Sequence, residues 1–269
     1  MIQGGGQGSV PPPPTRPALD RLLDIVVWGG LAALLLVSFG PAGIAKLPML
    51  FTNSGNIGEF SHDLLRPDFT LWKQYVAQMW LTIQIAVWGT GLSVLIAVPF
   101  GLLCARNIAP IWLQQPMRRL MDVLRSIPDL VLGTLFIVAV GLGPFAGVMA
   151  LALNTGAVLA KLFSEAVEAI DAGPVEGVRA TGGTRLHEVA WGVLPQVGPL
   201  WTSYALYRFE SNCRAAAVLG LIGAGGIGQN LIDSINGFAY RQTSAIVLVI
   251  IAAVTVIDLL SQAMRQRLI

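Results

Sequence analysis

The sequence predicts an all-α, polytopic integral membrane protein with about six membrane-spanning helices. Of its 269 residues, 54% are hydrophobic and only 12% are charged, with a mean hydropathy of +0.68. Soluble domains usually carry about a quarter charged residues. The apolar residues are also gathered in segments long enough to cross the ~30 Å hydrocarbon core of a bilayer. These two observations exclude an ordinary soluble domain.

Six apolar segments are separated by Gly, Pro and charged residues, and each is expected to form one span. The expected spans are 22–39, 78–104, 121–140, 145–163, 199–222 and 244–264. A Gly- and Pro-rich tail of residues 1–20 lacks the apolar residues needed to order it by burial. We therefore expect a disordered tail followed by one transmembrane domain, residues 21–269.

Two polar intervals interrupt the expected transmembrane domain. Residues 41–75 contain several helix breakers and aromatic residues typical of a membrane interface, with a short surface helix expected near 58–65. Residues 161–195 form the longest polar break between apolar spans. A Gly-rich segment through Tyr240 precedes the last span and is expected to be re-entrant or external.

The distribution of basic residues predicts the orientation of the spans, because cytoplasmic loops carry an excess of Lys and Arg. With the N-terminus inside, ten basic residues fall in cytoplasmic segments and four fall outside. The ten are Arg16, Arg21, Arg106, Arg118, Arg119, Lys161, Arg179, Arg185, Arg265 and Arg267; the four are Lys46, Arg66, Lys73 and Arg241. Both termini and the 161–195 interval are therefore expected in the cytoplasm, and 41–75 outside.

The second half of the 161–195 interval predicts two short helices. Gly173 can serve as the N-cap of the first helix, Pro174 suits its first position, and Glu176 falls at the third. Gly182 and Gly183 then end this helix. The sequence thus predicts a compact helix-turn-helix between two membrane spans, which would offer a docking surface for another protein.

The rest of the interval predicts the start of the next element. Thr184 can cap the second short helix, and Gly192 with Leu194-Pro195 marks where a new helix begins. His187 has no second histidine or thiol nearby, so a solvated or partner-contacting imidazole is favoured over a metal ligand. We expect no metal site.

This interval resembles the loop shared by permease subunits of binding-protein-dependent ABC importers. Their pattern runs Glu-Ala-Ala, three residues, Gly, nine residues, Ile, one residue, Leu-Pro. Glu176, Gly182, Leu194 and Pro195 keep this spacing, whereas Gly177-Val178 replaces Ala-Ala and Gly192 replaces Ile. The resemblance implies that the interval couples the spans to an ATPase. The residues assigned to this role are Glu176, Arg179, Gly182, Gly183, Leu186, Leu194 and Pro195.

Further motifs narrow the resemblance to phosphonate-type permeases, from about Asp63 to the C-terminus. They read Asp-Leu-Leu-Arg-Pro-Asp-Phe at 63–69, Arg-Ser-Ile-Pro-Asp-Leu at 125–130 and Gly-Leu-Gly-Pro-Phe-Ala-Gly at 141–147. Tyr-Arg-Phe-Glu-Ser-Asn-Cys-Arg-Ala follows at 207–215 and runs into a Gly-rich segment at 219–228. The resemblance implies a type I ABC importer permease in a bacterial cytoplasmic (inner) membrane.

The resemblance also implies partners and a division of labour. A second copy of the chain, two ATPase subunits and an extracytoplasmic substrate-binding protein are expected, with membrane lipid around them and no nucleic acid. No Gly-x-x-x-x-Gly-Lys-Ser/Thr phosphate loop occurs in the sequence. We therefore expect this chain to catalyse no reaction and to bind no cofactor, with ATP and Mg on the partner ATPase.

Charged residues inside the expected spans are the candidates for a translocation pathway. Each costs about 2.5–3.5 kcal/mol at mid-bilayer on insertion scales, so each should face protein or water. Glu210 and Arg214 are four residues apart and can pair along one helix face. Arg125 and Asp129 have the same spacing and can satisfy each other, although Pro128 disturbs the helix between them.

Arg208 has no acid at this spacing, because its i+4 neighbour is Asn212. We hypothesise that Arg208 faces the translocation path and binds an anionic oxyanion through its planar donor fork. The alternative is that it pairs with an acid on another span, such as Asp258, or with a carbonyl freed by a broken helix. Phosphonate, phosphate and phosphite share the tetrahedral anionic group that such a donor would bind, so the substrate stays open among them.

One motif favours a different function at first sight. Gly223 to Gly228 fits the Gly-x-Gly-x-x-Gly dinucleotide fingerprint, but that fingerprint needs a strand before it and an α/β unit around it. Here it ends a membrane span. We expect its glycines either to line a cavity or to pack helices closely. Cys104 and Cys213 lie in apolar spans and are expected to be inert.

Three alternative functions remain open at this stage. An ABC permease for another small solute would share most of these features. A stand-alone secondary transporter would need coupling-ion sites and usually internal repeats, and no convincing repeat is present. A membrane-embedded enzyme would need a reactive group of residues, but neither a Gly-x-Ser-x-Gly turn nor a His-containing triad pattern occurs.

Overall fold

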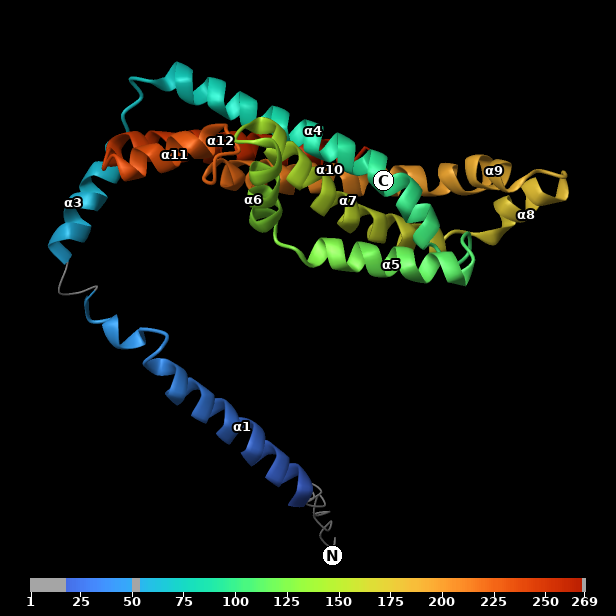
Figure 1. The fold of residues 1–269 in the computed structure, drawn as a ribbon, viewed down its shortest axis with the longest axis horizontal. Helices are drawn as coiled ribbons and strands as arrows, with labels where there is room; N and C mark the ends of the chain where they lie inside the picture. The colour runs from blue at the N-terminus through green and yellow to red at the C-terminus, as the bar shows by residue number, and fades with distance from the viewer. Residues whose placement is uncertain (1–17, 50–53, 268–269) are drawn as a thin grey trace, which may run out of the picture. The chain divides into compact units, whose positions relative to one another are not determined.

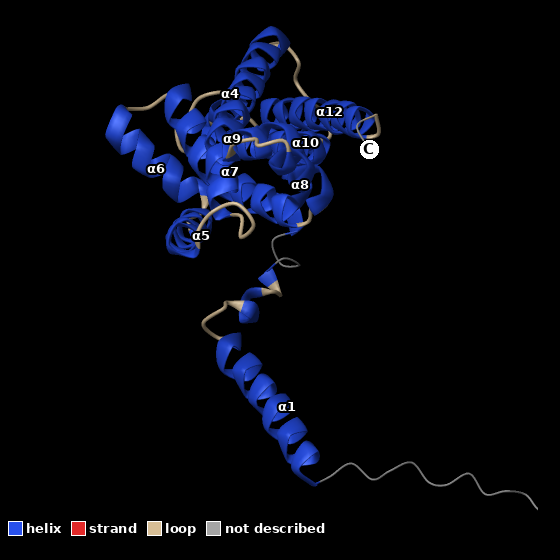
Figure 2. Cartoon of the chain, turned by 90° about the vertical axis from the view of Figure 1, so that its right-hand side faces the viewer, coloured by secondary structure: helices blue, strands red, loops and turns tan. Residues whose placement is uncertain are grey.

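The computed structural model describes residues 18–49 and 54–267, and these contain helices and loops but no strand (Figures 1 and 2). By internal contacts the chain divides into two units, residues 1–60 and 61–269. Each unit is described by itself. The prediction of an all-α fold is confirmed for the described part of the chain.

The first unit contains the first expected span. Helix α1 (Ala18–Phe39) is followed by a short 3-10 helix (Ile44–Lys46) and by α3 (Ser54–Leu64), whose last residues belong to the second unit. Large apolar side chains all around α1 are exposed, which is typical of a helix that meets lipid or another apolar surface. The predicted tail lies outside the described residues, except that residues 18–20 are helical rather than disordered.

The second unit is a bundle of long helices with short helices at its ends. Its elements after α3 are α4 (Trp72–Cys104), α5 (Ile111–Ser126), α6 (Asp129–Val140), α7 (Pro144–Glu168), α8 (Ala172–Ala180), α9 (Arg185–His187), a π-helix η2 (Glu188–Val193), α10 (Leu194–Gly220), α11 (Ile227–Asn236) and α12 (Tyr240–Arg265). Figure 1 shows α8 and α9 at one end of this unit, and α11 with the first turns of α4 and α12 at the other.

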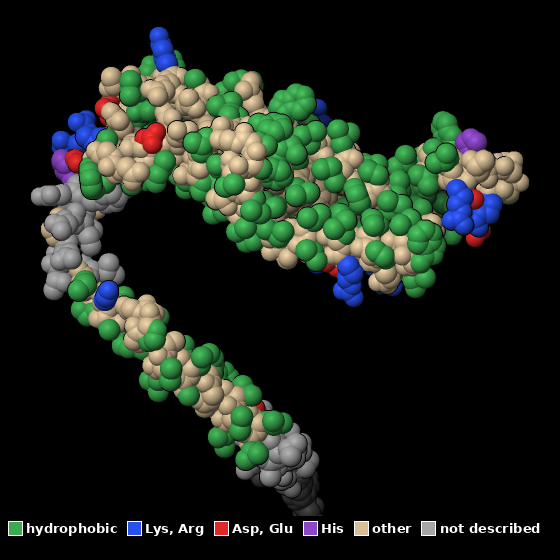
Figure 3. All heavy atoms as spheres, in the orientation of Figure 1, with side chains coloured by type: hydrophobic (Ala, Val, Ile, Leu, Met, Phe, Trp, Pro, Cys, Tyr) green, Lys and Arg blue, Asp and Glu red, His purple; other side chains and the backbone are tan. Residues whose placement is uncertain are grey.

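Four described helices are long and apolar enough to cross a membrane, namely α1, α4, α7 and α12. They match four of the six expected spans, with ends that differ by a few residues. Helix α10 covers a fifth expected span but is less apolar, because it carries Arg208, Glu210 and Arg214. Figure 3 shows hydrophobic side chains over the middle of the bundle and charged side chains chiefly towards its two ends.

The third expected span, 121–140, is wrong as a single helix. The chain forms α5 and α6, which meet at an angle of 90°. Pro128 disfavours the helical conformation of the residue before it, and both Ile127 and Pro128 are extended. Asn154 of α7 stabilises the break, because its Nδ2 donates to the Ile127 carbonyl at 2.8 Å.

The core is built mainly where α7 runs along α4. Small residues allow the two helices to approach closely: a side chain at Gly89 would meet the Leu151 Cβ at 2.8 Å, and one at Gly101 would meet the Phe163 Cβ at 2.8 Å. Close backbone approach through small residues is the usual way in which membrane helices pack. Phe163 also stacks on Trp201 of α10, with ring centroids 4.4 Å apart.

The Gly-rich segment 223–228 turns the chain from α10 into α11. Gly220 and Gly228 pack backbone against backbone: a Cβ added at Gly228 would lie 1.9 Å from the Ala217 carbonyl oxygen and 2.9 Å from the Gly220 Cα. Gly228 therefore packs two helices closely, which agrees with the close-packing interpretation of the motif, whereas Gly223, Gly225 and Gly226 have positive φ, which glycine adopts at little cost. The expected external or re-entrant segment contains α11.

We predict that Gly228→Ala will destabilise the protein by about 1–3 kcal/mol or more, because the new methyl group overpacks this contact. The measurement is the thermal unfolding of the purified protein in detergent. Gly91→Ala is the matched control, since no atom lies within 4 Å of a Cβ at that position in α4. Equal unfolding temperatures for the two variants would contradict the close contact.

Candidate functional site

The predicted helix-turn-helix lies in 171–193, between α7 and α10, and is named here the coupling hairpin after the role that the sequence resemblance implies for it. Its first helix, α8, is capped by Asp171, whose side chain accepts a hydrogen bond from the Gly173 backbone N–H at 3.0 Å. The prediction of Gly173 as N-cap is therefore wrong by two residues. A carboxylate is available to accept this bond, whereas glycine has no side chain to offer.

The turn of the coupling hairpin follows the prediction. Helix α8 ends at Ala180, and Gly182 adopts a left-handed conformation with φ of 81°, which costs glycine little. Thr184 then caps α9, and its backbone N–H donates to the Nδ1 atom of His187 at 3.2 Å. The π-helix η2 follows without a loop and runs directly into α10, which begins at Leu194 as expected.

An ion pair joins the two arms of the coupling hairpin. The Arg179 guanidinium donates from Nε and Nη2 to the two carboxylate oxygens of Glu188, at 2.9 and 3.1 Å. This fork geometry is the strongest form of the Arg–carboxylate pair. The hydrogen bond from Arg179 holds the pKa of Glu188 below its usual value. The pair is therefore fully present at neutral pH and is lost only when acid protonates Glu188.

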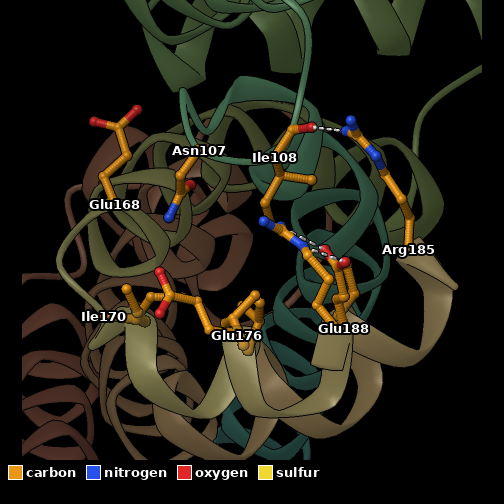
Figure 4. Close-up of a pocket in the computed structure, with 12 residues that line it drawn as sticks. Asn107, Ile108, Glu168, Ile170, Glu176, Arg185 and Glu188 are labelled. Atoms are coloured by element: carbon orange, nitrogen blue, oxygen red, sulfur yellow. Dashed lines mark hydrogen bonds and ion pairs between the residues drawn. The ribbon is translucent and has the colours of Figure 1, made fainter. Parts of the chain in front are cut away.

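A cavity of about 400 Å³ separates the coupling hairpin from the loop between α4 and α5 (Figure 4). Asn107 and Ile108 line it from the loop, and Glu176 points into it from α8. Arg185 crosses the space, because its Nη1 donates to the Ile108 carbonyl at 3.2 Å. The hairpin is thus held against the α4–α5 loop at a few polar contacts, with open space between them.

The outer surface of the coupling hairpin exposes large apolar side chains. Leu186 is 81% exposed and Trp191 is 71% exposed. Exposed aromatic and aliphatic side chains grouped on a polar surface indicate a protein interface. The sequence prediction included Leu186 but missed Trp191, although a lone tryptophan in a polar interval is a signal. Leu194 and Pro195 are also exposed, in the first turn of α10.

The base of the coupling hairpin is fixed to α5 by Glu168. Its carboxylate pairs with the Arg118 guanidinium and accepts the Arg106 backbone N–H at 2.8 Å. The sequence favours a solvated helix face for Glu165 and Glu168 over a pair of general acids, but these contacts show that Glu168 is not simply solvated. Glu165 is exposed and pairs with Lys161 of its own helix at 3.7 Å, which agrees with a solvated helix face at that position.

A chain of polar side chains runs through the interior of the bundle and is named here the polar chain. Arg208 of α10 donates to the Thr155 hydroxyl of α7 at 3.2 Å. Thr155 donates to the Asn212 carbonyl oxygen at 2.8 Å, and Asn212 donates to the Thr90 hydroxyl of α4 at 2.8 Å. Thr155 and Asn212 are almost fully buried. The polar chain therefore links three helices, and neither threonine was identified from the sequence.

Arg208 is the partly exposed end of the polar chain. Its Nε–H has no hydrogen-bond partner among the described residues, and neither does the Oδ1 atom of Asp129 in α6. The two charges act on each other, but no contact of 4 Å or less joins them among the described ion pairs. Arg208 is thus a guanidinium with unused donor capacity inside the bundle.

The remaining charges of α10 form a separate cluster with α12. Glu210 pairs with Arg214 at 3.1 Å, as the four-residue spacing predicted, and also with Arg265 at 3.2 Å. Arg214 pairs in turn with Asp258 at 3.3 Å. The alternative in which Arg208 pairs with Asp258 is therefore wrong, because Arg214 holds that carboxylate.

The predicted pair of Arg125 and Asp129 is also wrong. Arg125 pairs with Asp122 of its own helix at 3.1 Å. The 90° break between α5 and α6 separates Arg125 from Asp129, so the four-residue spacing no longer places them on one helix face. Of the six candidate pathway residues, Arg208, Asn212 and Asp129 lie together, whereas Glu210 and Arg214 form the cluster with α12.

We predict that Asn212→Ala will destabilise the protein by about 1–3 kcal/mol, because it leaves buried hydroxyl groups without partners. Thermal unfolding in detergent measures the effect. Thr255→Val is the control, since within the described part of the chain the exposed Thr255 hydroxyl bonds only to the Ile251 carbonyl of its own helix. An Asn212→Ala variant as stable as the control would show that the polar chain adds little to stability.

Residues 97–269 match the family described as "Binding-protein-dependent transport system inner membrane component". The phosphite transport system permease protein PtxC of Stutzerimonas stutzeri is 36% identical over 225 residues, which cover 83% of this chain and 82% of that protein. The phosphate-import permease protein PhnE of Mycolicibacterium smegmatis is 35% identical over 260 residues, which cover 96% of this chain but 49% of that protein.

Solved structures share the fold. A structure described as inward-facing conformations of the MetNI methionine ABC transporter aligns with a TM-score of 0.65 at 21% identity, covering 75% of this chain and 99% of that chain. An amino acid ABC transporter aligns with a TM-score of 0.59 at 20% identity, covering 74% of this chain and 98% of that chain. The architecture is therefore that of a type I ABC importer permease, as the resemblance implied. Because the family match covers more than half of the sequence, the chain belongs to the binding-protein-dependent transport system inner membrane component family.

Proposed function

We propose that this chain is the translocation subunit of an ATP-driven importer for a phosphonate or a related tetrahedral oxyanion, phosphate or phosphite. The observation that carries the proposal is Arg208, a guanidinium inside the bundle whose Nε–H has no partner in the part of the chain that the structure describes. Ionisable groups at membrane depth are rare and usually mark a substrate path. The hydrogen bond to Thr155 holds the guanidinium in place, so that its remaining donors can bind an oxyanion.

The relatives support this class of substrate. Their names include phosphite transport and phosphate import, and both anions present the tetrahedral oxygens that an Arg fork binds. Asp129 acts on Arg208 without a direct ion pair. A carboxylate at this position weakens the attraction for an anion, which suits a path where binding must be weak enough for release.

The coupling hairpin is proposed to bind the ATPase. Leu186 and Trp191 give it an exposed apolar surface, and Arg179 with Glu188 makes its two arms one rigid piece. Two ATPase subunits would hold ATP and Mg, while this chain would bind no cofactor and catalyse no covalent step. The hairpin must bind the ATPase with different energies in its two states, because only differential binding can shift the equilibrium between inward- and outward-facing forms.

The assembly is proposed to be a homodimer of this chain with two ATPases and an extracytoplasmic substrate-binding protein. The protein is a multi-pass component of the inner membrane, and we propose that both of its termini and the coupling hairpin face the cytoplasm. The positive-inside distribution supports this orientation. In that orientation α11 and the first turns of α4 and α12 face the outside, because they lie at the opposite end of the second unit (Figure 1).

We predict that Arg208→Gln will reduce oxyanion uptake by about 10–100-fold while the complex still assembles, since a hydrogen bond to a charged group is worth ~1.5–3 kcal/mol. Arg208→Lys should also be defective, because a single ammonium group cannot replace the planar fork. Radiolabelled uptake in cells or proteoliposomes measures the effect.

Arg125→Gln is the matched control for this prediction. Arg125 is exposed and pairs only with Asp122 of its own helix among the described ion pairs, so uptake should stay near the wild-type rate. Normal uptake by Arg208→Gln would sink the proposed role of Arg208, and an equal loss in the control would show that the assay responds to any missing arginine.

We predict that Trp191→Ala will weaken ATPase binding by at least tenfold, with little change in the stability of the permease, because Trp191 is exposed. Co-purification and titration with the cognate ATPase measure the binding. Trp88→Ala is the control, since Trp88 is similarly exposed, 65% against 71%, but lies within α4. Unchanged ATPase binding by Trp191→Ala would rule out this surface as the docking site.

A further inference from the structure

A second cavity lies at the end of the bundle opposite the coupling hairpin. It has a volume of about 290 Å³ and is lined by the start of α4, by α11 and by the start of α12. Its polar lining residues include Gln74, Tyr75, Asn230, Asp233 and Gln242. This volume can hold one large amino-acid side chain. The cavity is named here the end pocket.

Tyr75 is one of the residues that line the end pocket. Only 2% of its surface is exposed, yet its hydroxyl has no hydrogen-bond partner among the described residues. Buried tyrosine hydroxyls usually have a partner, because leaving one unpaired costs the full desolvation of the group. The hydroxyl oxygen is itself buried, so the wall of the end pocket at Tyr75 carries a polar group without a partner among the described residues.

The charge of the end pocket indicates what it would accept. Asp233 is its one ionisable acid, and none of the residues that line it is Lys, Arg or His. A carboxylate beside amide and hydroxyl groups favours a cationic donor and disfavours an anion. The end pocket therefore does not fit the oxyanion substrate, but it fits a Lys or Arg side chain from another protein.

Phe238 lies next to the end pocket in a strained backbone conformation. Among the described non-glycine residues it alone has positive φ, at 54°, and it directly follows the lining residue Gly237. It occupies the C′ position after α11, where the Ala239 N–H bonds back to the Ser234 carbonyl at 2.9 Å. Glycine is the usual residue in this motif, and a bulky side chain there is unfavourable.

The side chain of Phe238 is largely exposed. Phe238 is 76% exposed, and its ring meets Tyr240 edge to face with centroids 6.3 Å apart. Within the described chain the contact with Tyr240 is the one ring contact that this strained phenylalanine makes, and most of its side chain stays exposed. Strain of this kind is typical of functional positions, and exposed aromatic residues are enriched in protein interfaces.

The surroundings of the end pocket are rigid. The Ser234 and Thr243 hydroxyls are hydrogen-bonded at 2.9 Å, which joins α11 to α12. The loop before α4 is also bound to α12, because the Asp68 N–H donates to the Arg241 carbonyl at 3.0 Å and the Arg241 Nε donates to the Arg66 carbonyl at 3.2 Å. A preformed site of this kind loses little conformational entropy when a partner binds.

We propose that the end pocket and Phe238 together form the docking site for the extracytoplasmic substrate-binding protein. A Lys or Arg side chain of that protein enters the pocket and bonds to Asp233, while an apolar surface of the same protein covers Phe238. This inference rests on the proposed function, because the orientation proposed there places this end of the bundle outside the membrane.

The first experiment tests the orientation by itself. In Phe238→Cys the new thiol is exposed, whereas the native Cys104 and Cys213 are 1% and 0% exposed and should stay unlabelled. A membrane-impermeant maleimide should label this variant in intact spheroplasts. Labelling that appears only after lysis would place this end in the cytoplasm and would overturn both the orientation and the docking site.

The second experiment measures docking directly. The permease–ATPase complex in nanodiscs is titrated with its fluorescently labelled cognate binding protein loaded with phosphonate. Phe238→Gly and Asp233→Asn should each weaken binding at least fivefold. The Phe238→Gly complex should melt at the same or a higher temperature, because glycine relieves the backbone strain. A merely structural role for Phe238 would instead lower its melting temperature.

Controls separate failure of this inference from failure of the proposed function. Phe145→Ala removes another exposed aromatic side chain, 60% exposed at the start of α7, and should bind as the wild type does. If the wild-type complex binds no binding protein, the proposed function fails. If Phe238→Gly and Asp233→Asn bind the binding protein as tightly as the wild-type complex does, only the docking site is wrong. The same conclusion follows if Phe145→Ala is as defective as those two variants. If Phe238→Gly fails to insert into nanodiscs but docking is unchanged, the Phe238 ring contacts lipid, and the proposed docking site is overturned as well.

Discussion

The hydrocarbon core of a bilayer offers no water to polar groups, so each of them must find a partner inside the protein. The second unit meets this constraint with the polar chain. At one end of the polar chain, the Thr90 hydroxyl donates a hydrogen bond to the Ala86 carbonyl at 2.7 Å. The hydrogen bonds through Asn212 and Thr155 connect Thr90 to Arg208 at the other end. Because these bonds cross from α4 to α10 and from α10 to α7, they fix the three helices in one register. A buried polar network specifies its geometry strongly, since any slip leaves several groups unpaired at once.

Helix α10 connects this network to the coupling hairpin without an intervening loop. Leu194 and Arg208 lie on one helix, 14 residues apart, which corresponds to about 21 Å along its axis, so a displacement of the hairpin reaches the guanidinium through this helix. The same helix carries Glu210, which pairs with Arg265 of α12, and Arg214, which pairs with Asp258 of α12. Movement of α10 therefore acts on α12 through ion pairs and on α4 and α7 through hydrogen bonds. This arrangement gives a physical route from an ATPase surface to the interior of the bundle.

The sequence predicted the features that depend on local composition. Apolar length located the spans, and Gly182 and Thr184 located the turn of the coupling hairpin, because these signals act over a few residues. Predictions that required geometry failed. Hydropathy could not reveal that Ile127 and Pro128 are both extended, so the third span was taken as one helix and Arg125 was wrongly paired with Asp129. The members of the polar chain could not be predicted either. Thr155 and Thr90 lie on helices far from Arg208 in the sequence, and a threonine in an apolar span carries no signal of its own.

The packing of the coupling hairpin explains why residue 192 is Gly, where the family pattern has Ile. In the π-helix η2 this residue faces α8, and a Cβ there would lie 3.0 Å from the Val175 Cα. The absence of a side chain allows α8 to pack directly against η2. Gln196 of α10 completes the joint, since its Nε2 donates to the Gly192 carbonyl at 2.6 Å and its Oε1 accepts the Asp171 N–H at 3.1 Å. Together with the ion pair between Arg179 and Glu188, these contacts restrict the movement of the exposed Trp191 relative to α10. A larger residue at position 192 would separate α8 from η2, and part of any applied displacement would then be absorbed in the hairpin before it reached α10.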